Sequence, residues 1–142
     1  MYLCTMKVSF DFDSTLSRKD VQKFAKKLAD EGHEVWIVTS RFSDEAAKEK
    51  NWHWIFGQNE RLFDVAEECG IKKENIHFTC MESKSYFLEG KGFIFHLDDD
   101  DIELMDILEN NKYTGDKCFP VHVEHFEWKE TCQNLLKKNL AE

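Results

Sequence analysis

The chain has little of several things that would place it in a special class of proteins. It has one proline and six glycines in 142 residues, with no internal repeat and no low-complexity segment, so it is not expected to be disordered. No apolar run approaches the roughly 18 residues of a membrane-spanning helix. The start, MYLCTMKVSF, has too short an apolar stretch and the wrong flanks for a signal peptide. These absences predict a cytoplasmic protein with no membrane partner.

Paired metal-binding or redox residues are also missing. The cysteines form no C-x-x-C pair and are widely spaced, at Cys4, Cys69, Cys80, Cys118 and Cys132. The six histidines show no H-E-x-x-H or similar spacing, so no zinc site is predicted. We expect the cysteines to be reduced and mostly buried as small apolar side chains.

Positive charge is scarce as well. Nineteen Lys and Arg residues face 28 Asp and Glu residues, which gives a formal net charge of −9. Broad electrostatic binding to nucleic acid is therefore not expected, and any anionic substrate must be met by local groups. What the chain does have is 42% hydrophobic residues, including 12 Phe and 4 Trp. Its length fits one domain, 1–142, large enough to hold a core without disulfides.

Apolar strand patterns alternate with helix patterns along the chain. Strands are expected at 7–12, 34–39, 76–78, 92–97 and 117–123. Helices are expected from an N-cap at Ser17, with Asp20 completing a capping box, to a stop at Gly32, and then at 43–50, 59–69, 83–88, from 102 onward, and at 128–140. This alternation predicts a single three-layer α/β/α domain, Rossmann-like, with a mainly parallel five-stranded sheet. Pro120 places the fifth strand at an edge.

Polar side chains follow these strands. Ligands of open parallel sheets bind beyond the carboxyl ends of the strands, where loops and helix N-termini gather. The residues found there are Asp11 and Asp13 after the first strand, Thr39, Ser40 and Arg41 after the second, Asp98 and Asp99 after the fourth, and Lys84 on the short helix before it. All of them are expected at one edge of the sheet.

In this order, the motifs resemble those of the haloacid dehalogenase-like superfamily of phosphohydrolases. Four motifs between about Lys7 and Asp99 carry the resemblance: D-F-D-S-T-L, T-S, a lysine, and D-D. Ser14 stands where glycine is the commoner residue. The resemblance implies that Asp11 is a nucleophile forming an aspartyl-phosphate, and that Asp13 first protonates the leaving group and then activates water.

The remaining candidates take supporting roles by the same resemblance. Thr39 and Lys84 would contact the transferring phosphoryl group, with Ser40 beside them. Arg41 binds a second substrate charge or makes a surface ion pair. Four carboxylates in one site would repel a phosphate dianion unless a cation intervened, and oxygen ligands indicate Mg²⁺. By the resemblance, the Mg²⁺ ligands come from Asp11, the backbone carbonyl of Asp13, Asp98 and Asp99.

No cap domain is expected. Residues 15–39 hold one helix and one strand, and residues 39–84 hold one or two helices, a strand and the aromatic loop 51–57, which leaves no room for an inserted lid. An open site suits a phosphoprotein or a nucleic-acid end, and a nucleotide stays open as well. For Trp52, Trp54 and Phe56 we favour core packing over stacking on a base or an aromatic substrate.

Other interpretations of these residues remain. Asp11 and Asp13 are also typical of a turn after a strand, and we assign Asp100 and Asp101 to the first turn of a helix, where they complement its dipole. A non-catalytic or phosphotransfer domain that binds phosphate is the alternative function. A receiver-like domain is disfavoured because its acidic pair would precede the phosphorylated aspartate. Asp13 favours an enzyme, since only turnover requires it.

Overall fold

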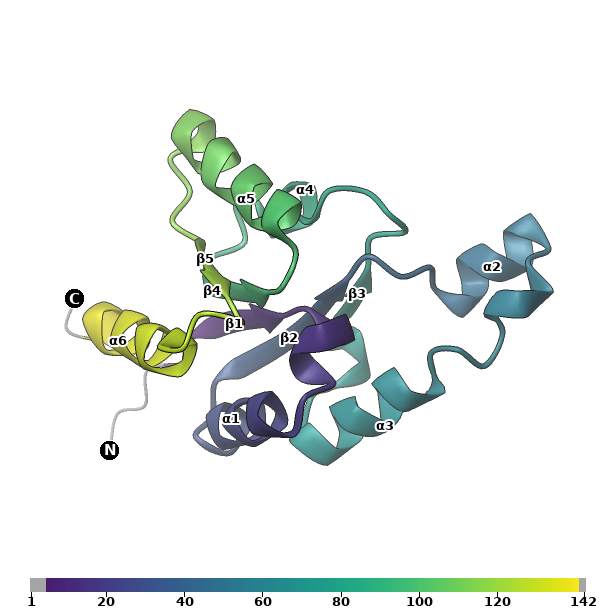
Figure 1. Cartoon of the computed structure of the whole chain (residues 1–142), viewed down its shortest axis with the longest axis horizontal. Helices are drawn as coiled ribbons and strands as arrows, with labels where there is room; N and C mark the ends of the chain where they lie inside the picture. Colours follow the sequence, from purple (N-terminus) through teal and green to yellow (C-terminus); the bar gives the residue numbers. More distant parts are fainter. Residues whose placement is uncertain (1–4, 141–142) are drawn as a thin grey trace.

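The computed structural model describes residues 5–140, and a five-stranded parallel sheet forms its centre (Figure 1). The strands are β1 (Lys7–Phe10), β2 (Glu34–Thr39), β3 (Ile76–Phe78), β4 (Phe93–Asp98) and β5 (Phe119–His122), in the order β3-β2-β1-β4-β5. Every neighbouring pair is parallel. The predicted sheet is therefore confirmed, with β1 in the middle and β5, which contains Pro120, at an edge.

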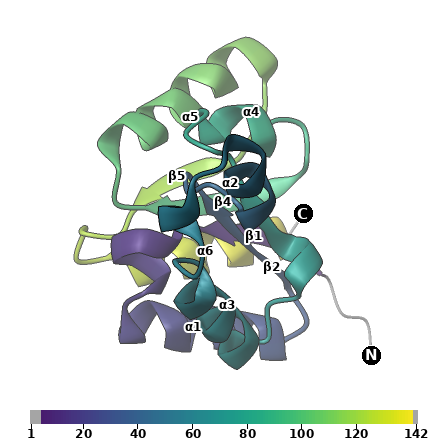
Figure 2. The ribbon, with the colours of Figure 1, turned by 90° about the vertical axis from the view of Figure 1, so that its right-hand side faces the viewer.

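Helices cover both faces of the sheet (Figure 1). One layer contains α1 (Lys19–Asp30), α3 (Glu60–Cys69) and α6 (Trp128–Leu140), and the other contains α4 (Lys84–Leu88) and α5 (Asp101–Thr114). The remaining α-helix, α2 (Asp44–Lys50), lies away from the sheet, beyond the carboxyl ends of the strands. It faces the viewer in Figure 2. None of the helices within residues 5–140 has the length and hydropathy needed to cross a membrane.

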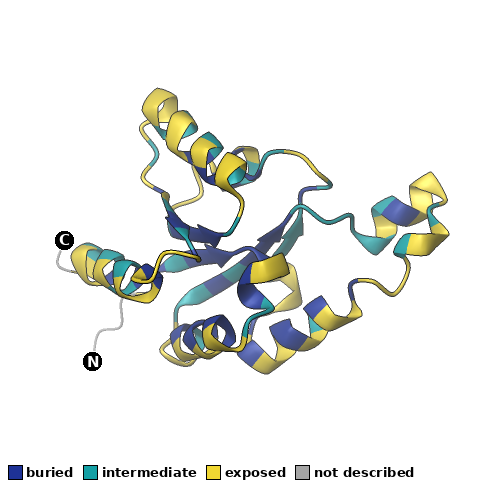
Figure 3. Cartoon of the chain, viewed as in Figure 1, coloured by how far each residue is buried: buried dark blue, intermediate teal, exposed yellow. Residues whose placement is uncertain are grey.

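The core lies mainly between the sheet and the first helix layer, where the inward helix faces are buried (Figure 3). Phe10 of β1 packs edge-to-face against Phe24 of α1 and Phe95 of β4, and Phe24 packs in the same way against Trp128 of α6. Because successive strand residues point to opposite faces, Ser9 and His96 face the other layer, which carries α4 and α5. This second side of the sheet leads to Lys84.

The start of α1 differs from the prediction. The structure has Arg18 rather than Ser17 at the N-cap position, with no side-chain cap, and Asp20 accepts hydrogen bonds from the Arg18 guanidinium instead. The reason is a separate tight turn over Phe12–Leu16, whose last bonds hold Ser17 in a helical conformation that an N-cap residue does not adopt. The capping box was therefore wrong.

The aromatic segment also differs from the prediction. Trp54 is 65% exposed and Phe56 is 42% exposed, so core packing was wrong for both. Trp54, in the short helical turn His53–Ile55, stacks on Trp52 with ring centroids 5.8 Å apart. The side-chain amide of Asn59 donates a hydrogen bond to the carbonyl of Phe42, which fixes the base of this segment. Residues 43–58 therefore form a small projecting lobe, and no folded cap is present within residues 5–140.

The cysteines yield a labelling prediction. Cys69, Cys118 and Cys132 are buried, and burial raises the pKa of Cys69 to about 11 and that of Cys118 to about 12. Cys80 is partly exposed, and Cys4 lies outside the described residues. We expect a thiol reagent at about pH 8 to modify Cys80 at least about tenfold faster than the other three, because the thiolate is the reactive form. Peptide mass spectrometry after brief exposure measures this, and equally fast labelling of Cys118 would contradict it.

Candidate active site

A buried lysine lies between two buried carboxylates at the carboxyl edge of the sheet. Lys84 Nζ is 2.8 Å from Asp11 Oδ1 and 2.6 Å from Asp98 Oδ2, and the three side chains are 2%, 7% and 0% exposed. They come from the start of α4, the end of β1 and the end of β4. The structure thus joins residues that are 73 and 14 positions apart in the sequence.

The backbone around Asp11 fixes its side chain. The Asp11 amide donates to the carbonyl of Leu97, which continues the pairing of β1 with β4, and the Asp11 carbonyl accepts from the amide of Leu16. Thr15 Oγ1 donates to Asp11 Oδ2 over 3.4 Å. The turn between them requires a left-handed residue, and Ser14 adopts it at φ 57°. This is a conformation that glycine adopts without strain, which explains why glycine is common at this position in the resembling family.

Asp98 accepts a hydrogen bond at every lone pair a carboxylate normally uses. Oδ1 accepts from the backbone amides of Asp99 (2.8 Å) and Asp100 (3.0 Å). Oδ2 accepts from Lys84 Nζ and from His96 Nε2, the latter at 2.7 Å. Four donors on two oxygens hold the group in one orientation. Asp98 therefore serves first as the partner of Lys84.

The pKa values of the cluster reflect burial first and the neighbouring charges second. Burial, together with the charge of Asp98, raises the pKa of Asp11 to about 8 despite the opposing charge of Lys84. Burial also opposes ionisation of Asp98, but the hydrogen bond from His96 and the charge of Lys84 outweigh it and lower its pKa. Burial disfavours the ammonium of Lys84, yet its two carboxylate partners raise its pKa. One lysine does not balance these carboxylates.

The acidic cluster can hold a metal ion. Asp11, Asp98 and Asp99 can each offer a carboxylate oxygen within 4.8 Å of the others. Such oxygen donors suit a hard divalent cation, which would neutralise the excess charge described above. Because the Asp98 oxygens are occupied by four donors, Asp11 and the half-buried Asp99 have the more accessible lone pairs. The residues present therefore fit a cation.

Asp13 and Arg41 form an ion pair at the rim. Arg41 donates from Nε to Asp13 Oδ2 at 2.9 Å and from Nη2 to Asp13 Oδ1 at 2.8 Å. Its remaining Nη1 donates to the carbonyl of Gln58 at the base of the lobe. Arg41 therefore makes the ion pair considered for it, and its contact with a second substrate charge stays a prediction. Thr39 is fully buried, and its hydroxyl accepts from the amide of Arg41.

An open cleft of about 550 Å³ lies over these groups. Within residues 5–140 its lining consists of Asp11, Asp13, Ser40, Lys84, Asp98, Asp99, Asp100, Asp101 and Ile102. Six of the eight predicted site residues therefore meet there, while Thr39 and Arg41 are not among the lining residues. Asp100 accepts hydrogen bonds from the amides of Ile102 and Glu103, so it caps α5 as its assignment to the first helical turn implied.

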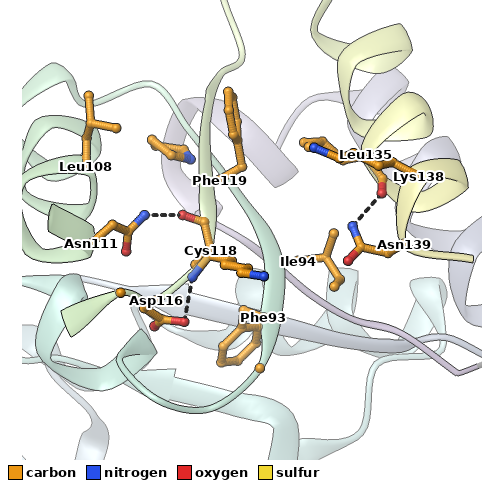
Figure 4. A pocket seen from close by; sticks show the side chains of 14 residues that line it. Phe93, Ile94, Leu108, Asn111, Asp116, Cys118, Phe119, Leu135, Lys138 and Asn139 are labelled. Atoms are coloured by element: carbon orange, nitrogen blue, oxygen red, sulfur yellow. Dashed lines mark hydrogen bonds between the residues drawn. The ribbon is translucent and has the colours of Figure 1, made fainter. Parts of the chain in front are cut away.

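A larger hollow of about 630 Å³ lies along β5 between α5 and α6 (Figure 4). Its amides bond to the backbone rather than to one another: Asn111 donates to the carbonyl of Cys118, and Asn139 to that of Leu135. Asp116 accepts from the amide of Lys117. No convergent set of reactive groups is found among its lining residues, so the acidic cleft is the better candidate site.

Sequence reasoning missed two buried residues next to the cluster. His96 and Ser9 are both 0% exposed, and Ser9 Oγ lies 2.7 Å from His96 Nδ1. The available signal was a lone histidine in the apolar strand "FIFHLD", two residues before Asp98 and thus on the same face of the strand.

Comparison with known proteins gives the fold a precedent. No protein-family model matches the chain, and no curated protein sequence matches it. The structure is similar to the HAD domain of the effector protein Lem4 from Legionella pneumophila, with a TM-score of 0.56, 13% sequence identity and 94% coverage of both chains. An inactive mutant of that domain gives a TM-score of 0.53 and 13% sequence identity, with coverage of 94% of this chain and 93% of that chain. At this identity the likeness shows the fold alone, and this chain has the HAD-like fold without a cap.

Proposed function

We propose that this protein is a magnesium-dependent phosphomonoesterase that works through an aspartyl-phosphate. One observation carries the proposal: a buried lysine bridges Asp11 and Asp98 at the end of adjacent strands, in an acidic cleft that also contains Asp13 and Asp99. Strong perturbation of buried ionisable groups in a cleft is typical of catalytic sites. The cleft lies where parallel sheets bind ligands.

Each residue has a definable part in this chemistry. Asp11 Oδ attacks phosphorus, and the bond to the leaving oxygen breaks while Asp13 gives that oxygen a proton. Asp13 then takes a proton from the water that hydrolyses the aspartyl-phosphate. Lys84 neutralises charge on Asp11 and on the phosphoryl group. Asp11, Asp98, Asp99 and the carbonyl of Asp13 would hold a Mg²⁺ ion, which would supply further positive charge.

Arg41 has a definite place in this scheme. Its paired donors hold the exposed carboxylate of Asp13 at the rim of the cleft, and we assign it the orientation of that acid. The alternative, a phosphate-binding or phosphotransfer domain without hydrolysis, does not need Asp13 at this position. The placement of Asp13 in the cleft therefore favours the enzyme.

Turnover of an aryl phosphate with Mg²⁺ or with EDTA tests the proposal, using the wild type and Asp13→Asn. We expect Mg²⁺-dependent phosphate release by the wild type. Asp13→Asn is expected to lower kcat by about 10²- to 10⁴-fold, because general acid–base catalysis contributes that much. The loss should be larger for an alkyl than for a p-nitrophenyl phosphate in the first, phosphorylating turnover, since the better leaving group needs less protonation. Release that is insensitive to EDTA would exclude the proposal.

The charge of the cleft bears on the substrate. Six aspartates and one lysine line it, so even with a divalent cation it disfavours nucleic-acid ends and nucleoside di- and triphosphates, which carry several phosphates. We propose a phosphoprotein substrate. Phosphopeptides flanked by arginine should be cleaved about tenfold faster than those flanked by glutamate at low salt, and the preference should shrink in high salt.

A pair of variants makes this comparison sharper. The side chain of Asp101 is 82% exposed at the cleft, so Asp101→Asn should reduce the preference for basic peptides. Asp64→Asn on the exposed side of α3 is the matched control and should not change it. Faster cleavage of a 3′-phosphorylated oligonucleotide than of either peptide would contradict the phosphoprotein proposal while leaving the phosphatase proposal intact. Cytoplasmic localisation stays a prediction.

A further inference from the structure

We propose that His96 is a positioning residue of this site: through Asp98 it fixes the amine of Lys84 against Asp11. The inference rests on the proposed phosphatase function for its kinetic consequences, whereas the geometry stands independently. His96 does not line the cleft, and it acts on the reacting groups only through Asp98.

The residues form one continuous buried chain. Ser9 Oγ lies 2.7 Å from His96 Nδ1, and His96 Nε2 lies 2.7 Å from Asp98 Oδ2. The same oxygen accepts from Lys84 Nζ at 2.6 Å, and Lys84 reaches Asp11 at 2.8 Å. Every member of this set is buried. No solvent therefore competes for these hydrogen bonds, and each is stronger than it would be at a surface.

The hydrogen-bond partners of His96 indicate which of its two ring nitrogens carries the proton. An ionised Asp98 can only accept, so His96 Nε2 must carry the proton and donate it. In the neutral imidazole that carries its proton on Nε2, Nδ1 is an acceptor. The Ser9 hydroxyl has one proton and two acceptors within reach, His96 Nδ1 at 2.7 Å and the carbonyl of Phe95 at 3.4 Å, and we assign the proton to the shorter contact. Ser9 thus selects the tautomer in which His96 presents a donor to Asp98, as outer partners of functional histidines commonly do.

The position of Lys84 depends on this arrangement. Two donors approach Asp98 Oδ2, and two backbone amides hold Oδ1, so neither the rotation of the carboxylate nor the site of the ammonium is free. Lys84 has three N–H donors, and Asp11 and Asp98 accept two of them. The third is left for the phosphoryl group. Without the His96 donor, the carboxylate can turn and the ammonium can follow it.

A purely structural role would not require these residue types. The neighbours of His96 in β4 are Phe95 and Leu97, and a buried polar chain costs free energy unless every group is paired. An apolar residue at position 96 would suit the strand equally well. The polar chain is explained if it orients the Lys84–Asp98 pair.

Kinetics of matched variants test the proposal. His96→Leu removes the donor and His96→Gln keeps an N–H at a similar reach, while Ser9→Ala removes only the tautomer-setting hydroxyl. We expect kcat to fall by about 10- to 100-fold in His96→Leu with KM little changed, and to recover at least about tenfold in His96→Gln. When Lys84→Met is already present, adding His96→Leu should lower kcat by less than about a further twofold, because both substitutions act on one contact.

The control is Thr79→Val. Thr79 is buried at the end of β3, and its hydroxyl has no hydrogen-bond partner among the described residues, so kcat should be unchanged. If His96→Leu does not fold, His96→Gln and Ser9→Ala carry the test. Ser9→Ala should lower kcat by about three- to tenfold.

A spectroscopic readout needs no turnover. In the metal-free wild type, ¹⁵N correlation spectra of the imidazole should show a proton on Nε2 and none on Nδ1, and Ser9→Ala should shift that pattern. A proton on Nδ1, equal losses in His96→Gln and His96→Leu, or an undiminished cost of His96→Leu in the Lys84→Met background would overturn the inference. If the wild type hydrolyses no phosphomonoester, the proposed function fails, and the spectra still decide the tautomer.

Discussion

Replacing Asp11 by asparagine is expected to abolish magnesium-dependent phosphate release and to stabilise the metal-free protein. Loss of the attacking oxygen should lower kcat by about 10³-fold or more, because an amide cannot form the acyl-phosphate. The isosteric amide also removes a carboxylate that burial disfavours, with the Asp11 pKa raised from 3.8 to about 8. We expect a gain of about 1–3 kcal/mol in the free energy of unfolding near neutral pH.

The gain should depend on pH in a definite direction. With a folded pKa raised above the unfolded value, Asp11 binds a proton in the folded state between pH 3.8 and about 8 that the unfolded chain does not bind. Its contribution to stability is therefore complete below that range and is lost as the pH rises through it. The advantage of Asp11→Asn should be near zero at the acid end and grow toward the alkaline end.

Urea unfolding at several pH values in EDTA, together with phosphate release in Mg²⁺, measures both effects. Asp64→Asn, on the exposed surface of α3, is the matched control for removal of one negative charge. Turnover by Asp11→Asn within tenfold of the wild type would remove Asp11 from the role of nucleophile. A variant less stable than the wild type throughout would show that the Lys84 ion pair, rather than burial, dominates at this position.

Lys84→Met is expected to be the most destabilising single change at the site. It leaves Asp11 and Asp98 buried side by side without their common partner, and breaking a buried pair in this way costs about 3–5 kcal/mol. We expect kcat to fall by about 10²- to 10³-fold as well, as for loss of a group that stabilises transition-state charge. Mg²⁺ should restore part of the stability, because it replaces some of the missing positive charge.

Lys91→Met is the control for Lys84→Met. Lys91 is the next lysine along the chain, but its side chain is exposed and its ammonium donates to the carbonyl of Phe87. It should keep full activity and nearly full stability. Thermal unfolding with and without Mg²⁺ separates the two effects, and a Lys84→Met protein as stable as the wild type in EDTA would contradict the buried-pair account.

The sequence was sufficient for the sheet and for most of the cleft. The spacing of apolar residues and the position of a residue at the end of a strand are local properties of the sequence. They placed Asp11, Asp13 and Asp98 at one edge of the sheet, because parallel strands all end there, and Lys84 on the short helix before the fourth strand. The single proline marked the edge strand for an equally local reason, since proline lacks the amide that an inner strand would use. These conclusions needed no knowledge of how side chains meet.

The remainder depended on contacts that pattern does not encode. Trp54 resembles a core residue, but residues 43–58 project from the sheet, and Trp54 is left 65% exposed among the described residues. The choice between Asp98 and Asp99 as the freer oxygen donor followed only from counting the four donors on Asp98. The hydrogen bond between Ser9 and His96 joins residues 87 positions apart, so no local sequence signal could pair them.

The central position of β1 has a consequence for how the protein reaches its native state. β1 pairs with β2, which follows it closely, but it must also pair with β4, as in the match of Phe10 with Leu97. A ribosome-bound chain that has not yet exposed β4 therefore holds Asp11 without Asp98, the residue that anchors Lys84 beside it. Such long-range pairings are slow to form, so catalytic competence arrives late in folding, with closure of the β1–β4 seam.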